Sequence, residues 1–188
     1  MNEIALARHG ESVSAAQGLV GGDTPPTLRG RDEARVLGQR LRPRAIDVCV
    51  TSGARRAQQT AAIALEGTSI LATIDNDLGD IRFGCFEGKP LTEYRRWIAL
   101  HRPEEAPLGG ESRIETIRRF ARAFRALLAR PEDLVLVVAH GLTLRSVLDP
   151  KPGPIVAGTA YGSCVLLTAA ELERAVNLLE GWCDAPSW

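Results

Sequence analysis

Residues 134–141 read Leu-Val-Leu-Val-Val-Ala-His-Gly, an unbroken apolar run that ends at a histidine and a glycine. Six consecutive apolar residues predict a strand that is covered on both faces, as in the centre of a parallel sheet. The chain repeats this order near its N-terminus, where the apolar residues 4–7 precede Arg8, His9 and Gly10. Because ligands bind at the carboxyl ends of strands in open α/β sheets, both strand-end histidines are candidates for one site.

Helical patterns alternate with further short apolar runs along the rest of the chain. Beyond the two strands above, strands are expected at 46–51, 69–74 and 163–167, and helices at about 28–42, 54–65, 92–101, 113–128, 143–148 and from 169 onwards. Ser112 with Glu115, and Thr168 with Glu171, form capping-box patterns before the last two long helices. This alternation predicts a three-layer α/β/α sandwich with a mostly parallel central sheet.

The length of 188 residues suits one compact domain spanning 1–188. The segment 76–110 breaks the alternation and is rich in glycine, proline and charge. We therefore expect it to be an excursion over the active-site end of the sheet. Glycines and prolines at 150–158 predict a loop rather than a domain boundary.

The composition limits the classes of partner. The chain has 23 basic and 23 acidic residues and no basic block, so nucleic acid is not expected as a partner. No apolar stretch approaches the length of a membrane span and no signal segment is evident, which favours a cytoplasmic protein without membrane contact. Four cysteines without a CxxC pair give no support to a zinc site or a disulfide framework. The oligomeric state, monomer or dimer, stays open.

The residues Arg8-His9-Gly10 suit phosphate chemistry. Glycine lets the backbone approach a ligand closely, and arginine offers a planar fork for phosphate oxygens. A neutral histidine can act as a nucleophile. Taken alone, this triplet fits a buried structural histidine equally well. His140 followed by Gly141 favours the functional interpretation, whereas His101, the third histidine, is expected to be a surface or structural residue.

Arg56 is the candidate second cation. It follows the strand expected at 46–51 and falls in the first turn of the next helix, where free N–H groups favour anions. A single arginine is more commonly a solvated surface residue. Arg55 is the natural control, since one helical step turns it in another direction.

Several stretches of the chain, in this order, resemble one family. They are Arg8 to Ser12, Asp23 to Gly30, Thr51 to Ala61, Leu78 to Gly88 with Gly109 to Ser112, and Ala139 to Gly141. The chain is similar to the histidine phosphatase superfamily, also called phosphoglycerate mutase-like, and within it to the small phosphatase branch that includes α-ribazole and broad-specificity phosphatases. The ordered set covers almost the whole chain and is far more specific than the first motif alone.

The resemblance implies a mechanism without metal or other cofactor, in which a small-molecule phosphate ester transfers its phosphoryl group to His9. The residues implied in catalysis are His9, Asp80, His140, Arg8 and Arg56, and those implied in phosphate or substrate binding are Arg8, Ser12, Arg56, Gly141 and Leu142. Asp80 would donate the proton to the leaving group.

The chain departs from the family pattern at several places, of which Gly53-Ala54 in place of the usual Pro-Leu is the mildest. Asp80 stands where the family usually has the longer glutamate, and Phe86 replaces a tryptophan. Ser14 and Ala15 replace the Trp-Asn pair common in mutases. Glu87 is the alternative proton donor, although we interpret it as structural. Glu11 is expected at the pocket edge or in a structural role.

The sequence thus predicts a phosphatase, with a phosphoglycerate mutase as the first alternative and a non-catalytic phosphate-binding module as the second. Substrate selection is expected from the excursion and from the loop at 150–161. The candidate selectors are Arg82, Tyr94, Arg113 and Tyr161, each of which would more commonly be a surface or packing residue.

Overall fold

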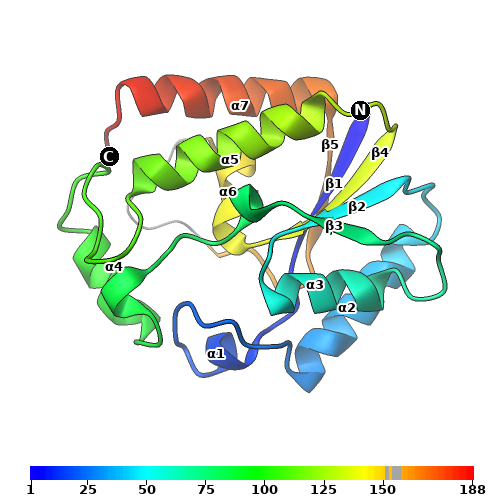
Figure 1. The fold of residues 1–188 in the computed structure, drawn as a ribbon, viewed down its shortest axis with the longest axis horizontal. Helices are drawn as coiled ribbons and strands as arrows, with labels where there is room; N and C mark the ends of the chain where they lie inside the picture. The colour runs from blue at the N-terminus through cyan, green and yellow to red at the C-terminus, as the bar shows by residue number, and fades with distance from the viewer. Residues whose placement is uncertain (151–152, 154–157) are drawn as a thin grey trace.

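The structure is a computed structural model, and it describes residues 1–150, 153 and 158–188. Its centre is a sheet of five strands in the order β3-β2-β4-β1-β5 (Figure 1). The strands are β1 (Glu3–Arg8), β2 (Val48–Thr51), β3 (Ala72–Ile74), β4 (Leu134–Ala139) and β5 (Cys164–Thr168). Only β5 runs antiparallel to its neighbour among these strands, so the predicted mostly parallel sheet is confirmed.

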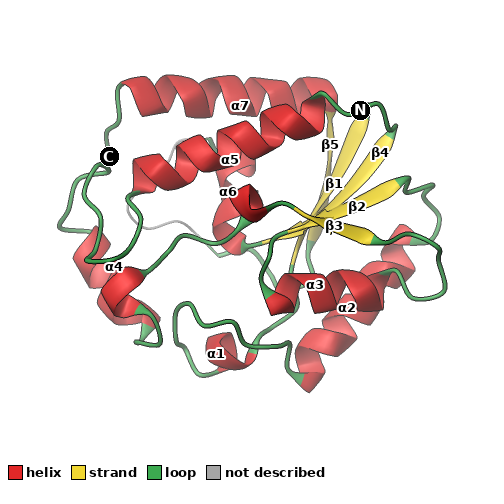
Figure 2. Ribbon diagram, viewed as in Figure 1, coloured by secondary structure: helices red, strands yellow, loops and turns green. Residues whose placement is uncertain are grey.

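Helices cover both faces of this sheet (Figure 2). Helices α2 (Leu28–Leu41) and α3 (Arg55–Ala64) pack on one face, and α5 (Arg113–Leu128), α6 (Gly141–Leu148) and α7 (Ala169–Asp184) pack on the other. Alternation along β1 explains the two cores. Ile4 and Leu6 join the core under α5 and α7, whereas Ala5 and Ala7 join the core under α2 and α3. The predicted three-layer sandwich is confirmed.

Both predicted capping boxes are present, and they start α5 and α7. Other predicted boundaries need correction. The helix expected from Thr143 begins at Gly141, because His140 has extended backbone and its carbonyl accepts the Leu144 N–H as an N-cap residue does. The strand expected at 69–74 shortens to β3, since the Thr68 hydroxyl accepts the Ile70 N–H in a local turn.

The segment 76–110, predicted to be an excursion, contains no strand in the structure. It contains the short 3-10 helices η1 (Asn76–Leu78) and η2 (Gly84–Phe86) and the helix α4 (Leu91–Ile98), three residues shorter at its C-terminal end than expected. A separate apolar cluster holds it in place: Val20, Ile81, Phe83, Tyr94 and Ile98. The short helix α1 (Val13–Ala16), which was not predicted, lies across the cavity described below.

Candidate active site

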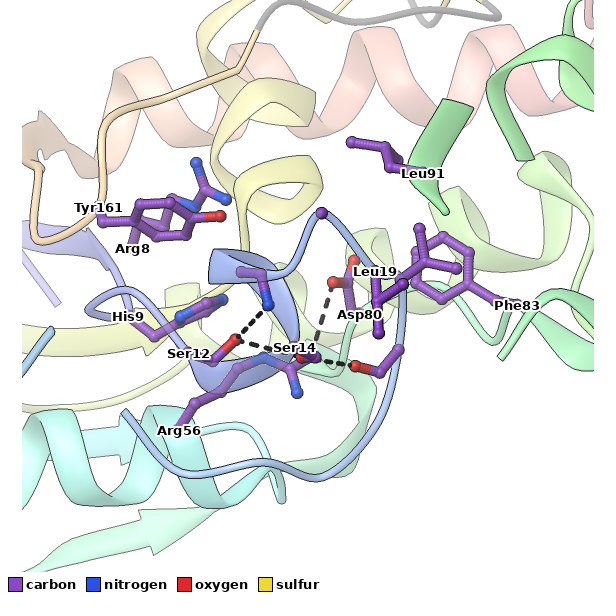
Figure 3. A pocket seen from close by; sticks show the side chains of 14 residues that line it. Arg8, His9, Ser12, Ser14, Leu19, Arg56, Asp80, Phe83, Leu91 and Tyr161 are labelled. Atoms are coloured by element: carbon purple, nitrogen blue, oxygen red, sulfur yellow. Dashed lines mark hydrogen bonds and ion pairs between the residues drawn. The ribbon is translucent and has the colours of Figure 1, made fainter. Parts of the chain in front are cut away.

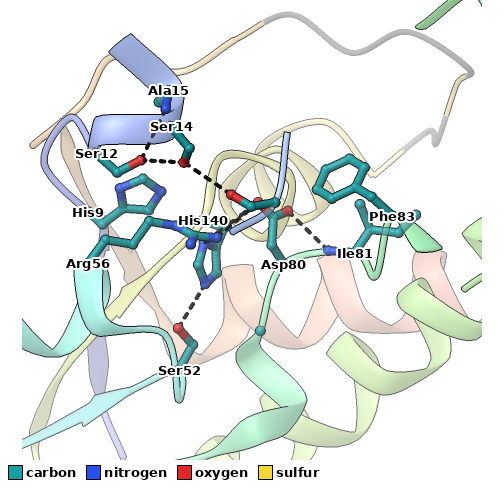
Figure 4. Close-up of polar contacts among 12 residues, drawn as sticks. His9, Ser12, Ser14, Ala15, Ser52, Arg56, Asp80, Ile81, Phe83 and His140 are labelled. Carbon is teal, nitrogen blue, oxygen red and sulfur yellow. Dashed lines mark hydrogen bonds and ion pairs between the residues drawn. The ribbon is translucent and has the colours of Figure 1, made fainter. Parts of the chain in front are cut away.

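The two strand-end histidines meet at one edge of the sheet. Strands β1 and β4 are parallel neighbours, and Arg8 lies opposite Ala139 in their register. The His9 N–H donates to the Ala139 carbonyl at 3.0 Å. The imidazole rings of His9 and His140 consequently lie with their centroids 5.1 Å apart (Figure 4). The predicted convergence of the two strand ends is confirmed.

A cavity of about 150 Å³ opens beside His9 (Figure 3). Its polar side is formed by Arg8, His9, Ser12, Ser14, Arg56 and Asp80, and the rest of its lining by Ala15, Gly18, Leu19, Val20, Gly21, Phe83, Leu91 and Tyr161. One side can therefore hold an anion, while the other offers an apolar surface to whatever the anion is attached to.

His9 has a neutral ring with one free nitrogen lone pair. Its Nδ1 lies 2.7 Å from the Gly10 carbonyl, so Nδ1 carries the proton of the neutral ring and Nε2 keeps its lone pair. Burial lowers the pKa of His9 well below 6.5, and the charges of neighbouring groups, including Arg56, lower that pKa further. The ring is thus neutral at physiological pH, as a nucleophile must be.

His140 lies beneath the cavity and does not line it. It is 0% exposed, and its Nε2 lies 2.8 Å from the Ser52 hydroxyl. Its Nδ1 lies 3.3 Å from Nη2 of Arg56 and accepts from it, so Nε2 carries the ring proton. Burial, followed by the charges of Arg56 and Arg8, lowers the pKa of His140 well below 6.5. His140 therefore acts on the cavity indirectly, by accepting a hydrogen bond from the Arg56 guanidinium.

Arg56 and Arg55 behave as the sequence predicted. Arg56 lies in the first turn of α3 with its guanidinium buried at the cavity, where Nη1 donates to the Gly22 carbonyl at 2.8 Å. Arg55 is exposed to solvent, and its backbone N–H donates to the carboxylate of Asp23 at 2.7 Å. The two neighbours therefore form a matched pair of test and control positions.

Arg8 supplies the second guanidinium at the cavity. Its guanidinium carbon lies 3.7 Å from the ring centroid of Tyr161, and its Nη1 donates to the Thr159 carbonyl. Tyr161, one of the candidate selectors, lines the cavity with its ring centroid 5.7 Å from that of His9. Gly141 leaves room for the Arg8 side chain, because a Cβ at this position would lie 3.3 Å from the Arg8 guanidinium carbon.

Asp80 is the carboxylate at the cavity. One oxygen accepts the Ile81 N–H at 3.0 Å, and the other lies 3.7 Å from both Nη2 of Arg56 and Nδ1 of His140. Glu87 is occupied elsewhere, since it accepts the N–H groups of Gly22 and Phe83 at 2.9 and 3.2 Å. The geometry therefore favours Asp80 over Glu87 as the carboxylate that meets a ligand.

Of the residues expected to bind phosphate, the structure brings Ser12 to the cavity but not Gly141 or Leu142. The Ser12 hydroxyl caps α1 by accepting the Ala15 N–H at 3.4 Å. Gly141 and Leu142 lie at the start of α6, outside the cavity lining. Ser14 does line it, although the sequence showed only that this position departs from the family; its hydroxyl lies 2.9 Å from that of Thr24.

Gly10 was expected to let the backbone approach a ligand closely, and this expectation needs correction. A Cβ at Gly10 would lie 2.1 Å from the carbonyl oxygen of Gly30, so this glycine permits close packing of the β1 end against α2. It does not line the cavity. Glu11 also has a structural role, because its carboxylate accepts the Thr27 hydroxyl at 3.0 Å.

The remaining candidate selectors lie away from the main cavity. Tyr94 and Arg113 are buried in the packing of the excursion. Arg82 is largely exposed, lines an adjacent hollow with Asp80 and pairs with Glu111 at 3.7 Å. Much of the loop expected at 150–158 falls outside the described residues.

In the described residues, no group of three or more His, Cys, Asp or Glu side chains is placed to hold a metal ion. The same residues contain no helix long and apolar enough to cross a membrane. All four cysteines are free thiols.

The fold and the site together define an α/β protein with a histidine and two guanidiniums around an anion-sized cavity at the strand ends. The sequence profile of the histidine phosphatase superfamily (branch 1) matches residues 4–150. The chain belongs to this superfamily, and the resemblance identified from the sequence is confirmed.

The chain is also similar to one curated relative and to two proteins of known structure. A 2,3-bisphosphoglycerate-dependent phosphoglycerate mutase of Methylobacterium sp. (strain 4-46) is 37% identical over 162 residues, which are 77% of this chain and 78% of the mutase. The structure of Bacillus stearothermophilus YhfR is 28% identical, with a TM-score of 0.77 over 88% of this chain and 90% of that one. The α-ribazole phosphatase of Shigella flexneri shares the fold at 23% identity, with a TM-score of 0.74 over 87% and 89%.

Proposed function

We propose that this protein hydrolyses phosphomonoesters without a metal ion, through a phosphohistidine formed on His9. The observation that carries the proposal is the state of His9. Its ring is neutral, its Nδ1 is bonded to a carbonyl, and it lines a cavity that also holds the guanidiniums of Arg8 and Arg56. Such a ring has one free nitrogen lone pair to offer to phosphorus.

In the first step, Nε2 of His9 attacks phosphorus while the bond from phosphorus to the ester oxygen breaks. Arg8 and Arg56 stabilise the charge on the non-bridging oxygens, and this electrostatic term is the main source of catalysis in phosphoryl transfer. Asp80 in its acid form gives its proton to the departing oxygen. The products of this step are phosphohistidine, the free alcohol and the Asp80 carboxylate.

In the second step, the Asp80 carboxylate takes a proton from water, and the resulting oxygen attacks the phosphorus of phosphohistidine. The bond from phosphorus to nitrogen breaks, and inorganic phosphate leaves. His9 returns to its neutral form and Asp80 to its acid form, so the cycle closes without a cofactor.

The cavity lining supports hydrolysis of a phosphate ester with an uncharged leaving group. Beyond the two arginines, the described lining residues include no further cation. Leu19, Val20, Phe83 and Leu91 instead form an apolar wall. A phosphoglycerate carries a carboxylate that would compete for the same arginines, so the lining favours a phosphatase over a mutase.

The mutase alternative has support of its own, because the Methylobacterium relative is named as a phosphoglycerate mutase. One assay separates the two reactions: the purified protein is given 4-nitrophenyl phosphate or 3-phosphoglycerate, and free phosphate and isomerised product are both measured. The proposal expects phosphate release that disappears in His9→Ala. Isomerisation that exceeds phosphate release would favour the mutase, and binding without turnover would favour a non-catalytic module.

A further inference from the structure

Behind the cavity, the side chain of Arg119 reaches from α5 to the segment that carries Asp80. Arg119 is 7% exposed, and all five of its N–H donors are used. Nη1 donates to the carbonyls of Asp77 and Gly79 at 2.7 and 2.9 Å. Nη2 donates to the carbonyl of Asp80 itself at 3.2 Å.

The remaining donors of Arg119 bind Glu111, which is 2% exposed. Nε and Nη2 meet the two carboxylate oxygens at 3.0 and 2.8 Å, a bidentate arrangement. Burial alone would raise the pKa of Glu111, but its hydrogen bonds to Arg119 outweigh this effect and hold the pKa below its ordinary value. The pair is therefore an ionised carboxylate on a guanidinium.

Glu111 also holds the other side of Asp80. Its carboxylate accepts the backbone N–H of Arg82 at 3.3 Å, and its own N–H donates to the Arg82 carbonyl at 2.9 Å. Arg119 thus holds the backbone up to Asp80 by donating to its carbonyls. Glu111 holds the backbone after Asp80 through its two hydrogen bonds with Arg82.

Asp80 needs such support because it lies in no helix or strand. It sits between η1 and η2, and among the described residues its carboxylate accepts the Ile81 N–H and has ion-pair contacts at 3.7 Å with Arg56 and His140. Aspartate is one methylene shorter than the glutamate usual in the family, so the position of its oxygens follows the backbone closely. An error of about 1 Å in the placement of a reacting group can cost on the order of 100-fold in rate.

We infer that Arg119 and Glu111 are positioning residues, which hold the Asp80 carboxylate at the distance needed to protonate the leaving group. The inference rests on the proposed function, since it assigns these residues to the proton transfer of that reaction. Neither residue lines the cavity, so neither is expected to touch the substrate.

The test uses a series of substituted phenyl phosphates and an alkyl phosphate, with kcat/KM measured for wild type, Arg119→Lys and Glu111→Gln. A misplaced proton donor harms poor leaving groups most, because good ones depart without a proton. We expect kcat/KM to fall about 100-fold for the alkyl ester and less than about threefold for the best aryl leaving group. The plot of log kcat/KM against leaving-group pKa should steepen, as it should in Asp80→Asn.

Arg122→Lys is the matched control. Arg122 lies three residues along the same helix and pairs with the Asp77 carboxylate in the same segment, but its side chain is 64% exposed. An exposed ion pair of this kind contributes little, so its leaving-group dependence should equal that of wild type.

Three results would overturn the inference while leaving the proposed function intact. In the first, Asp80→Asn steepens the plot but Arg119→Lys and Glu111→Gln do not. In the second, the two variants slow all esters equally. In the third, neither variant folds, as judged by thermal unfolding. If the slope of log kcat/KM against leaving-group pKa for Asp80→Asn equals that of wild type, the role of Asp80 in the proposed function is refuted, and this inference with it.

Discussion

The two sides of the cavity are built in different ways. On one side, His9 and His140 follow directly from neighbouring parallel strands, whose register places them side by side. On the other side, Asp80 belongs to a segment without strands, which is held by an apolar cluster and by the buried pair of Arg119 and Glu111. Backbone hydrogen bonds position His9, whereas side-chain hydrogen bonds position the Asp80 carboxylate.

This difference has a consequence for substitutions. A strand end is fixed by many backbone bonds shared with the whole sheet, so a single side-chain change at the surface cannot move it. The Asp80 segment depends on a few side-chain donors and should respond to individual substitutions. Variants on the two sides should consequently differ in kind: loss of all turnover on one side, and selective loss for particular leaving groups on the other.

Asp80→Asn removes the proposed proton donor on the excursion side of the cavity. It should have the largest effect of the three changes considered next. Asparagine has no proton to give as an acid, and a general acid contributes about 10²–10⁴-fold. We expect a loss of that order for an alkyl phosphate and a much smaller loss for 4-nitrophenyl phosphate, both measured as kcat/KM. Equal losses for the two esters would contradict the role of Asp80.

Arg56→Lys tests the contribution of the Arg56 guanidinium on the strand side of the cavity, and Arg55→Lys is its control. Lysine cannot reproduce both the bond to the Gly22 carbonyl and the contact with His140 that the Arg56 fork makes. Loss of about 2–3 kcal/mol of charge stabilisation would lower kcat roughly 30–150-fold for every ester. Arg55→Lys should leave kcat unchanged, and equal effects at the two positions would refute the assignment.

The sequence could predict the strand side almost completely. Apolar runs that end in His-Gly give the strand ends, and the first turn of the next helix gives Arg56, since these features are local in the chain. The excursion side was predicted only in outline. Asp80 was found through its family position, but the pairing of Glu111 with Arg119 joins side chains to carbonyls of a distant segment, and no spacing rule reports such contacts.

Two further site features depend on packing for the same reason. The sequence named Tyr161 only as one of four candidate selectors, and the packing of its loop brings it into the cavity lining and onto Arg8. Gly10 fits the phosphate interpretation by sequence, yet it is required by its contact with Gly30. Both depend on which elements pack together, which the periodicity of one element does not determine.

The dependence of stability on pH is the smallest expected effect and tests the strand side again. The pKa of His9 is lowered in the folded state, so below about pH 6.5 the unfolded chain takes up a proton that the folded protein does not. The free energy of unfolding should therefore fall as pH decreases from this value towards the folded pKa, by about 1.4 kcal/mol per pH unit for this one group.

Urea unfolding of wild type and His9→Gln at pH 7.5 and 5.5 measures this contribution. The variant should lose less stability than wild type over the same interval, because one buried neutral histidine has been removed. Equal losses would show that His9 titrates in the folded protein as it does in the unfolded chain.

The central claim is that His9 itself carries the phosphoryl group during turnover. Rapid quenching of the protein with a phosphate ester in excess, followed by mass spectrometry of peptides under alkaline conditions, tests it most directly. The account predicts one added phosphoryl group on His9, stable to base and lost in acid, and absent from His9→Ala. A phosphoryl group on another residue, or turnover by His9→Ala at the wild-type rate, would contradict it.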